Sequence, residues 1–351
     1  MCRFLIFKGT DPILLSNLLT RPAHSIINQS YDSRLRLDMR RPINGDGFGV
    51  GYYPQNRDDP ELDSGPCVYC AITPAWNNQN LARLAEKTKS DLVFAHVRAS
   101  TAGVLSETNC HPFVYHTLMF MHNGHVSGFN RIKKRLADYI REEYFLMVQG
   151  GTDSEWVFAL FLNCLEDLGC NPADPKGKYS HKNLRQALLS TIEKIKDWTK
   201  EVNGPDGEPS LLNIAITDGS SVVVSRYVTS RTEEAASLHF SSGTRFFEYS
   251  AGQYRMERRD RGQNIIMVAS EPLTFERSDW ITIPTNTILS INGQTVLLHP
   301  ILDEYHQLDP SYTRSSGFAE SKGLVSPMPV SQPTAVPPLE REGRRRDSIT
   351  V

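Results

Sequence analysis

The chain opens with Met1-Cys2-Arg3-Phe4-Leu5-Ile6-Phe7, a cysteine directly behind the initiator methionine followed by an apolar run. Because cysteine is small, we expect an aminopeptidase to remove Met1 and leave Cys2 as the mature N-terminus. Cys2 then carries a thiol, with an ordinary pKa of about 8.5, and a free α-amine, with one of about 8. The amine can take the thiol proton, directly or through a water molecule, and return it to a leaving amine. The apolar run predicts a buried strand that holds this nucleophile rigidly.

Length, composition and charge limit the class of protein. The chain has 351 residues, 39% of them hydrophobic, which is enough for one large core or two modest ones. A formal net charge of −2 gives no electrostatic basis for binding nucleic acid or an anionic membrane. No apolar run approaches the roughly 18–20 residues of a transmembrane helix, and Lys8 and Asp11 interrupt any secretory signal. Six cysteines without framework spacing suit a reducing compartment, so we expect a cytoplasmic protein.

Taken alone, a cysteine at position 2 is more often incidental than catalytic, so the nucleophile hypothesis depends on motifs further along the chain. The first of these follows an apolar run at residues 92–95, which ends in His96-Val97-Arg98-Ala99-Ser100-Thr101. An arginine at the mouth of a buried strand is costly to desolvate unless it meets an anion. Its planar guanidinium suits a carboxylate, which it binds through two parallel hydrogen bonds. Asn109, His111 and Pro112 come shortly afterwards.

Two further motifs each admit a structural and a functional interpretation. The apolar residues 118–121 lead into His122-Asn123-Gly124, and Asn-Gly at the end of a strand is typical of a hairpin turn. The alternative is an oxyanion hole, in which the Asn123 amide and the Gly124 N–H point at one developing charge. In Thr152-Asp153-Ser154-Glu155, Thr152 or Asp153 caps the following helix, or Asp153 offers a carboxylate to an ammonium group.

Three other segments carry weaker signals. The glycine-rich residues 44–53 precede a predicted strand and lack Gly-Lys-Ser/Thr, so they predict a closely packed pocket wall and not a phosphate loop. Cys67-Val68-Tyr69-Cys70 has no second pair at zinc spacing, which favours core packing over metal or redox chemistry. The arginine-dense residues 21–41 predict either a solvated loop or a surface that faces a partner or substrate.

Hydrophobic periodicity predicts strands and helices that interleave without regular βαβ spacing. This pattern indicates an α+β fold of stacked antiparallel sheets covered by helices. One long amphipathic helix is expected at residues 129–147. Other helices are expected at residues 81–87, 157–168 and 184–198, and residues 13–19 form a short apolar segment. Strands are expected at residues 1–9, 92–95, 118–121, 211–217, 221–227, 237–241, 264–269, 280–283, 288–291 and 295–298.

Beyond Tyr305 the periodic pattern is lost. Ser, Pro, Gly and charged residues dominate, and such a segment buries too little apolar surface to become ordered. We therefore predict one domain over residues 2–304 and a disordered Ser/Pro/Arg-rich tail over residues 305–351. The tail contains a weak basophilic phosphorylation motif at Arg345-Arg346-Asp347-Ser348.

The order and spacing of five motifs resemble the class II glutamine amidotransferases. The resemblance covers residues 1–300 and is carried by Met1-Cys2, His96 to Thr101, His111-Pro112, His122-Asn123-Gly124 and Thr152 to Glu155. The family implies the four-layer αββα sandwich of N-terminal nucleophile hydrolases. Finer features look closest to the fungal amidotransferase subunits of the DUG pathway of glutathione degradation, at residues 19–30, 72–80, 269–277 and 338–343.

The resemblance implies a role for each candidate catalytic residue. It makes Cys2 the nucleophile, and it makes the Asn123 amide and the Gly124 N–H the oxyanion hole. Removing one donor from such a hole costs about 10²–10³ in rate. Neither a cofactor nor a metal is expected.

The resemblance also implies a substrate-binding set made of Arg98, Thr101, His111 and Asp153. Arg98 would hold the α-carboxylate and Asp153 the α-ammonium group of a γ-glutamyl compound. Glutathione and glutamine share this head and differ in the leaving group, so the site residues do not choose between them. The resemblance favours glutathione, with a larger peptidase-like partner subunit. The alternatives are a glutaminase subunit that supplies ammonia to an acceptor enzyme on another chain, and a catalytically silent scaffold.

Two departures from the family pattern bear on the acceptor of any ammonia. Sugar-amidating members carry Trp directly after the arginine and His after the threonine, where this chain has Ala99 and Ala102. The resemblance therefore does not extend to lid closure or ammonia channelling. No second catalytic domain is predicted after residue 300, so we expect an acceptor site to lie on another chain.

Overall fold

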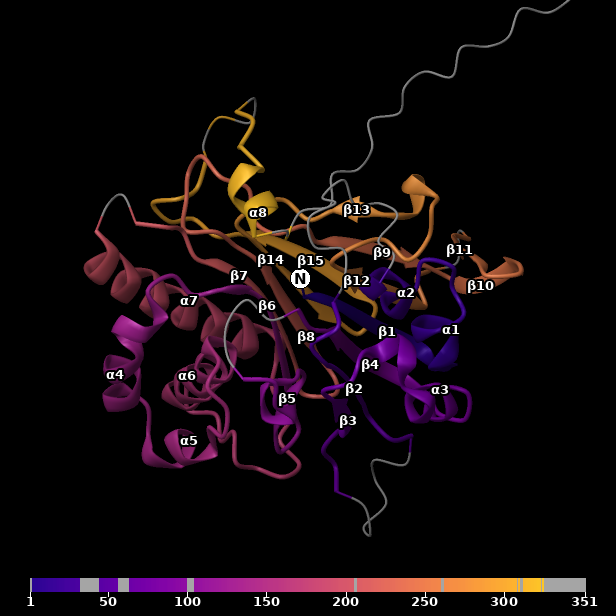
Figure 1. The fold of residues 1–351 in the computed structure, drawn as a ribbon, viewed down its shortest axis with the longest axis horizontal. Coiled ribbons are helices and arrows are strands. Elements are labelled where there is room, and N and C mark those ends of the chain that lie inside the picture. The colour runs from indigo at the N-terminus through magenta and orange to yellow at the C-terminus, as the bar shows by residue number, and fades with distance from the viewer. Residues whose placement is uncertain are drawn as a thin grey trace, which may run out of the picture.

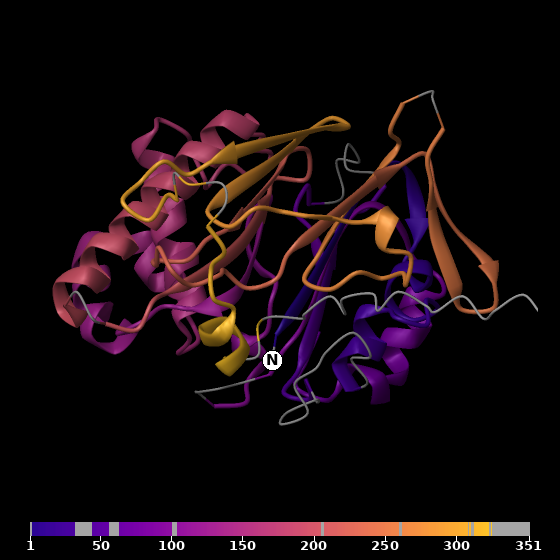
Figure 2. The same ribbon diagram turned by 90° about the horizontal axis from the view of Figure 1, so that it is seen from above.

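The structure is a computed structural model, and it describes residues 2–31, 44–55, 63–99, 104–204, 207–259, 262–307, 309, 312–322 and 324. In this part of the chain two antiparallel sheets face each other, and helices cover the outer face of each sheet (Figure 1, Figure 2). The αββα sandwich of an α+β protein, predicted from the sequence, is confirmed.

The first sheet places the N-terminal strand in its middle. Strand β1 (Arg3–Leu14) pairs antiparallel with β12 (Ile265–Ala269) on one side and with β4 (Lys89–Val97) on the other. Among the described residues this sheet contains, in spatial order, β13 (Ile281–Thr282), β9 (His239–Gly243), β12 (Ile265–Ala269), β1, β4 (Lys89–Val97), β2 (Phe48–Tyr52) and β3 (Cys67–Ala71).

The second sheet carries the predicted oxyanion motif on β6, next to its edge strand. In the described part of the chain its spatial order is β15 (Thr295–Pro300), β14 (Thr287–Asn292), β8 (Val222–Arg226), β7 (Leu211–Thr217), β6 (Leu118–His125) and β5 (Phe113–Tyr115). A separate two-stranded hairpin consists of β10 (Arg245–Ser250) and β11 (Gln253–Glu257).

Side-chain alternation along β1 explains why its apolar run is uninterrupted. Phe4 and Ile6 point into the cluster between the two sheets, where they meet residues such as Met121 of β6. Leu5 and Phe7 point the other way, into the core beneath the first helices. The run from Phe4 to Phe7 is therefore apolar throughout because the strand is buried on both faces, as predicted.

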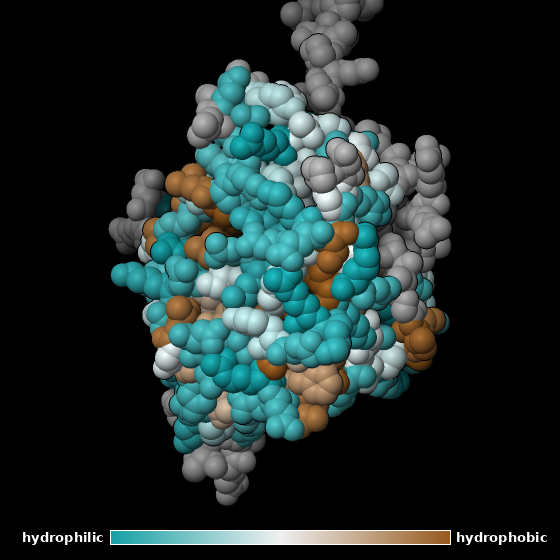
Figure 3. Space-filling model, turned by 90° about the vertical axis from the view of Figure 1, so that its left-hand side faces the viewer, coloured by the Kyte–Doolittle hydropathy of each residue, from teal (hydrophilic) through white to brown (hydrophobic). Residues whose placement is uncertain are grey.

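Helices form the two outer layers. Near the first sheet lie α1 (Ser16–Leu19), α2 (Ile26–Tyr31) and α3 (Gln79–Ala85). On the second sheet lie α4 (Phe129–Tyr139), α5 (Glu142–Met147), α6 (Asp153–Asp167) and α7 (His181–Asn203). Short 3₁₀ turns occur at Ala75–Asn77, Glu107–Asn109 and Arg277–Asp279. The side of the molecule formed by α4 to α7 is mainly hydrophilic with scattered apolar spots (Figure 3), as expected for amphipathic helices that bury one face.

The single long helix predicted at residues 129–147 is wrong. Helix α4 ends at Tyr139, Ile140 is extended with φ −75° and ψ 147°, and α5 begins two residues later. The Arg141 N–H at the break donates to Asn163 Oδ1 of α6 at 3.0 Å. A tertiary hydrogen bond therefore supports a break that the helical periodicity hides.

The described structure continues past the predicted domain boundary at residue 304, so the tail does not begin there. A short helix α8 (Gly317–Ser321) follows, and the Ser237 N–H donates to the Leu324 carbonyl oxygen at 2.8 Å. Leu324 is buried in a small apolar cluster with Leu211, Val228, Ala235 and Ala236. Residues 325–351 of the predicted tail, with the phosphorylation motif, lie outside the described residues. No helix in the described part of the chain combines the length and the apolarity needed to cross a membrane.

Candidate active site

Cys2 lies at the start of β1, in the middle of the first sheet. Its side chain is half-buried, and its Sγ lies 3.7 Å from the Ala99 carbonyl oxygen. Since Arg3 of β1 pairs with Val97 of β4, the antiparallel register places Cys2 beside Arg98. The pairing of these two strands therefore brings the predicted nucleophile and the predicted carboxylate-binding arginine together.

Arg98 is buried, and the glycine-rich segment holds its main chain. The Arg98 N–H donates to the Gly47 carbonyl oxygen at 2.8 Å, and the Asp46 N–H donates to the Arg98 carbonyl oxygen at 3.1 Å. Gly47 has φ +110°, and a Cβ there would approach the Cys110 Sγ to 2.8 Å. Glycine allows both this backbone conformation and the close approach. The segment is thus closely packed against Arg98, in agreement with the predicted wall.

Asn123 and Gly124 lie inside a strand of the second sheet. Because β6 extends to His125 and pairs there with β7, the hairpin-turn interpretation of this motif is wrong. A Cβ on Gly124 would lie 1.8 Å from the Leu211 carbonyl oxygen, so close packing of the main chain requires glycine at this position. Asn123 is buried, with 1% of its surface exposed.

The amide of Asn123 is directed toward the strand that carries Cys2. Its Nδ2 donates to Ser270 Oγ at 3.2 Å, and the same oxygen accepts from the Phe4 N–H at 3.1 Å. The donor end of the Asn123 amide therefore faces the first residues of β1. This orientation is the one that an oxyanion hole beside Cys2 requires.

Asp153 is the first residue of α6, where the helix dipole favours a carboxylate. Its Oδ2 accepts from the Val126 N–H at 2.8 Å, which ties the start of α6 to the end of β6. Thr152 occupies the N-cap position, but its side chain makes no capping hydrogen bond. The Asp153 carboxylate thus lies at Val126, the residue that follows β6 and is three positions after Asn123.

His122 connects the same two elements and was not singled out from the sequence. Its Nε2 lies 3.0 Å from the Leu211 carbonyl oxygen, and its Nδ1 lies 2.9 Å from Ser154 Oγ. Because a carbonyl oxygen only accepts, Nε2 carries a hydrogen. Ser154 Oγ, which contacts Nδ1, also lies 3.3 Å from Asp153 Oδ1. The His122 imidazole of β6 therefore contacts both β7 and the first turn of α6. These contacts hold the start of α6, with Asp153, close to the predicted oxyanion motif.

His111 is buried against His96, with 4.2 Å between their ring centroids. Burial, and after it the nearby Arg98 charge, lower the pKa of His96 to about 3. Burial also holds the pKa of His111 well below its usual range, and the nearby Arg98 charge acts in the same direction. Both imidazoles are neutral at physiological pH, so they pack near Arg98 without adding positive charge.

The remaining sequence predictions for this region have mixed outcomes. Thr101, predicted to bind substrate, lies outside the described residues. Of the predicted core pair, Cys70 is half-buried and Cys67 is exposed on β3. Burial raises the pKa of the Cys70 thiol to about 12. Among the described residues no cluster of His, Cys, Asp and Glu is arranged to hold a metal ion.

A buried ion pair lies directly behind the nucleophile, and the sequence interpretation missed it. Arg3 and Glu271 are 1% and 0% exposed, and Arg3 Nη2 lies 2.5 Å from Glu271 Oε1. The available signal was an arginine within an otherwise apolar strand, which requires an acidic partner. That partner is 268 positions away in the sequence, and local patterns do not identify it.

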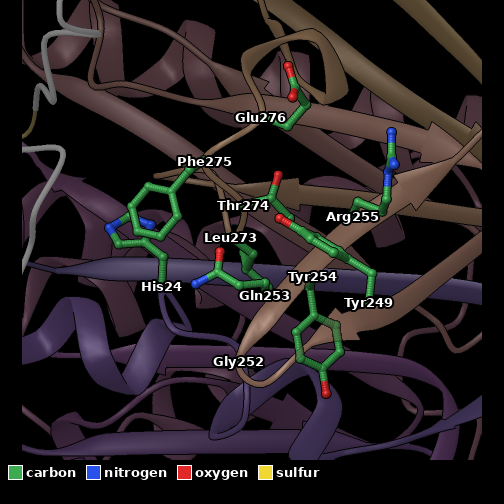
Figure 4. Close-up of a pocket in the computed structure, with 10 residues that line it drawn as sticks. All are labelled: His24, Tyr249, Gly252, Gln253, Tyr254, Arg255, Leu273, Thr274, Phe275 and Glu276. Atoms are coloured by element: carbon green, nitrogen blue, oxygen red, sulfur yellow. The ribbon is translucent and has the colours of Figure 1, made fainter.

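A surface cavity of about 290 Å³ lies on the other side of this ion pair, between the β10–β11 hairpin and residues 273–276 (Figure 4). None of the predicted site residues lines it. His24 and Phe275 face each other there with ring centroids 5.4 Å apart. His24 also contacts the ion pair, because its Nε2 lies 3.7 Å from Glu271 Oε2.

The part of the chain that contains most of the candidate site residues matches a known protein family. Residues 16–307 match the family model described as glutamine amidotransferases class II. This chain belongs to the class II glutamine amidotransferases. Arg98, Asn123, Gly124 and Asp153 lie within the matched span, and Cys2 lies before it.

Individual relatives agree with this family assignment. The chain is 65% identical to the probable glutamine amidotransferase DUG3 of Saccharomyces cerevisiae, over 100% of this chain and 99% of that protein. It is 29% identical to the γ-glutamyl-hercynylcysteine sulfoxide hydrolase of Mycolicibacterium smegmatis, over 35% of this chain and 51% of the relative. The structure of a glutamine aminotransferase class-II domain protein from Silicibacter pomeroyi superimposes with a TM-score of 0.54 and 25% identity, over 85% of this chain and 98% of that one. The class II amidotransferase family predicted from the sequence is thus confirmed.

Proposed function

We propose that this class II amidotransferase cleaves the γ-glutamyl bond of glutathione through a thioester on Cys2. The observation that carries the proposal is the junction between the sheets, where Ser270 Oγ accepts from both the Asn123 amide and the strand of Cys2. One hydroxyl group thereby joins the proposed oxyanion donor of one sheet to the strand of the other sheet that carries the proposed nucleophile. The scaffold alternative gives no reason for this arrangement.

The proposed reaction begins when the mature α-amine of Cys2 takes the thiol proton and the thiolate attacks the γ-carbonyl carbon. The carbonyl oxygen becomes negatively charged, and the Asn123 amide and the Gly124 N–H stabilise it. When the tetrahedral adduct collapses, its C–N bond breaks and the ammonium returns the proton to the leaving amine. Water then attacks the γ-glutamyl thioester, which releases glutamate and restores the thiol.

In this proposal Arg98 and Asp153 bind the two charged groups at the amino-acid end of the substrate. The Arg98 guanidinium pairs with the α-carboxylate, and the Asp153 carboxylate at the start of α6 pairs with the α-ammonium group. Thr101 is assigned to the same substrate surface. His111 is assigned to it as a neutral side chain, because burial keeps its pKa low.

The choice of glutathione over glutamine is supported by the relatives. One relative is named a hydrolase of a γ-glutamyl-hercynylcysteine sulfoxide, although the similarity covers only 35% of this chain. The full-length relative is named a probable glutamine amidotransferase. That name supports the second candidate function, a glutaminase subunit that supplies ammonia to another chain.

We also propose a larger peptidase-like partner subunit and a cytoplasmic location. Cleavage at the γ-glutamyl bond leaves cysteinylglycine, whose own peptide bond the proposed reaction does not touch. A peptidase subunit would use that product. The net charge of −2 supports neither a nucleic-acid nor a membrane partner.

The test uses the full-length chain, with removal of Met1 verified by intact mass, alone and together with a candidate partner subunit. Glutamate, cysteinylglycine and ammonia are measured after incubation with glutathione or glutamine. Glutathione should yield equal amounts of glutamate and cysteinylglycine. Cys2→Ala should reduce this by at least ~10⁴-fold without changing the thermal unfolding curve, whereas Cys170→Ala, at a half-buried cysteine between α6 and α7, should retain activity.

Two results would contradict the proposal in different ways. Ammonia from glutamine without cleavage of glutathione would establish the glutaminase alternative. Active protein that retains Met1 would exclude the α-amine as the base.

A further inference from the structure

Two consecutive residues after β12 contact both halves of the proposed site. Ser270 and Glu271 follow the end of this strand, which lies beside β1 in the first sheet. Both side chains are buried, with 1% and 0% of their surface exposed. Polar groups buried this deeply are costly unless their hydrogen bonds are satisfied, so their partners indicate what they do.

Ser270 joins the two sheets through its hydroxyl oxygen. Ser270 Oγ accepts from the Phe4 N–H and from Asn123 Nδ2, and the Ser270 N–H donates to the Phe4 carbonyl oxygen at 3.0 Å. The hydroxyl is therefore fixed to the strand of Cys2, and it determines which end of the Asn123 amide faces that strand. A primary amide has two N–H groups, so one remains for a developing oxyanion.

Glu271 acts on the nucleophile through Arg3. Its Oε1 lies 2.5 Å from Arg3 Nε, and Arg3 Nη1 donates to the Cys2 carbonyl oxygen at 3.1 Å. The guanidinium thereby fixes the peptide plane that follows Cys2. The directions in which the α-amine and the thiol of Cys2 leave the main chain depend on that plane.

We propose that Ser270 and Glu271 are positioning residues that set the orientation of the Cys2 nucleophile relative to the Asn123 oxyanion donor. Ser270 works through Asn123, and Glu271 works through Arg3. A buried ion pair contributes little net stability compared with a well-packed apolar pair, so its position beside the nucleophile points to a geometric role. The part of the inference tested by turnover rests on the proposed γ-glutamyl hydrolysis, and the part tested by alkylation does not.

The charge of Glu271 has a second consequence for Cys2. Its carboxylate balances the Arg3 guanidinium, which contacts the Cys2 carbonyl oxygen, and His24 faces the same carboxylate from its other oxygen. Without that negative charge, the remaining positive charge would favour the thiolate and disfavour the protonated amine. A residue with a purely structural role would not produce this change.

The first experiment is a double-mutant cycle with Ser270→Ala and Asn123→Ala in the full-length mature chain. Ser270→Ala alone should lower kcat for the γ-glutamyl substrate about 3- to 10-fold, with KM within about two-fold of the original value. In the Asn123→Ala background the same substitution should have no further effect beyond about two-fold. Ser290→Ala, at an equally buried serine of β14, is the matched control and should leave kcat unchanged.

The second experiment measures the rate at which iodoacetamide alkylates Cys2 as a function of pH. Glu271→Gln keeps the shape of the side chain and removes its charge, so the midpoint of the profile should move to lower pH by at least about 0.5 unit. Glu276→Gln makes the same chemical change at an exposed position of the adjoining segment and should leave the midpoint in place. Arg3→Lys keeps the positive charge and loses the geometry of the guanidinium contacts. It should therefore leave the midpoint in place and lower kcat.

Each outcome decides the inference. Multiplicative losses in the Ser270 and Asn123 double variant, or a Glu271→Gln alkylation profile that matches the unmodified chain, would overturn it. If the chain alkylates normally but cleaves neither glutathione nor glutamine, the proposed function fails, and the alkylation profiles still test the role of Glu271.

Discussion

Arg98 combines deep burial with a permanent charge, and its neighbours are arranged around that charge. The main chain of Arg98 is held by Asp46 and Gly47, and neutral His96 and His111 lie nearby. Local burial alone does not explain an arginine at this place, because desolvating the guanidinium is costly. The proposed recognition of a substrate α-carboxylate would give the position a function.

Arg98→Lys should raise the KM for a γ-glutamyl substrate about 10- to 100-fold, because lysine keeps the charge and loses the two-pronged hydrogen bonding. Steady-state kinetics with glutathione and glutamine would measure the change. Arg245→Lys, at an exposed arginine of β10, is the control and should leave KM unaltered. An unchanged KM for Arg98→Lys would show that the arginine does not contact the substrate.

At the scale of elements, β6 joins three functions in consecutive residues. His122 ties the strand to the first turn of α6, Asn123 faces the strand of Cys2, and Gly124 allows β7 to approach. Alternation along a strand sends neighbouring side chains to opposite faces, so one short segment serves both the helix layer and the space between the sheets. The pairing of β6 with β7 is therefore as important to the site as the residue types themselves.

Gly124→Ala should lower the free energy of unfolding by about 1–3 kcal/mol, because the added Cβ would lie 1.8 Å from the Leu211 carbonyl oxygen. Urea denaturation would measure this loss. A Cβ on Gly151 meets nothing within 4 Å, so Gly151→Ala should change stability by less than about 0.5 kcal/mol. Equal stability of the two variants would mean that β6 and β7 are not packed as described.

At the scale of the whole molecule, the last described segment closes the side of the sandwich near the end of β6. Phe318 of α8 lies with its ring centroid 6.4 Å from that of His125, and Lys322 Nζ donates to Glu208 Oε1 at 2.8 Å. Arg314 donates to the Tyr305 carbonyl oxygen at 2.7 Å. These contacts make the segment part of the domain and not a tail that hangs from it.

A chain that ends at residue 311 should therefore be less stable than one that ends at residue 324. The shorter chain loses the burial of Leu324 and the hydrogen bonds of Arg314, which together should contribute about 3 kcal/mol or more. Thermal unfolding of the two truncated proteins under identical conditions would compare them. Equal midpoints would show that the segment is dispensable for the fold.

The stability of the sandwich should also depend on pH through its buried histidines. The pKa of His96 is lowered to about 3 by burial, whereas in the unfolded chain it would titrate near 6.5. Above about pH 6.5 neither state is protonated, and the histidine has no effect on stability. As the pH falls below that value only the unfolded state binds a proton, so stability falls by up to about 1.4 kcal/mol per pH unit.

Urea denaturation between pH 7.5 and pH 5.5 would measure this dependence. His96→Gln removes one buried histidine. Below pH 6.5 it should reduce the slope of the unfolding free energy against pH by up to about 1.4 kcal/mol per pH unit. His116→Gln, at a residue of the β5–β6 connection, provides a comparison. An identical slope for the original chain and His96→Gln would show that His96 titrates alike in the folded and unfolded states.

The sequence by itself determined the family and the class of fold. Cys2, Arg98 and Asp153 became candidates because each belongs to a short local motif, and the order of these motifs resembles the class II amidotransferases. The apolar strands were identifiable because their periodicity is also local. Where local signals compete or are absent, only the tertiary structure decided the conformation. Asn-Gly lies within a strand because β7 pairs with it. The helix at residues 129–147 breaks where Asn163 binds the Arg141 N–H. The tertiary structure alone revealed the partners of Asn123 and Arg3, which are Ser270 at 147 positions and Glu271 at 268 positions away. Contacts between residues so far apart leave no periodic or spacing signal in the chain.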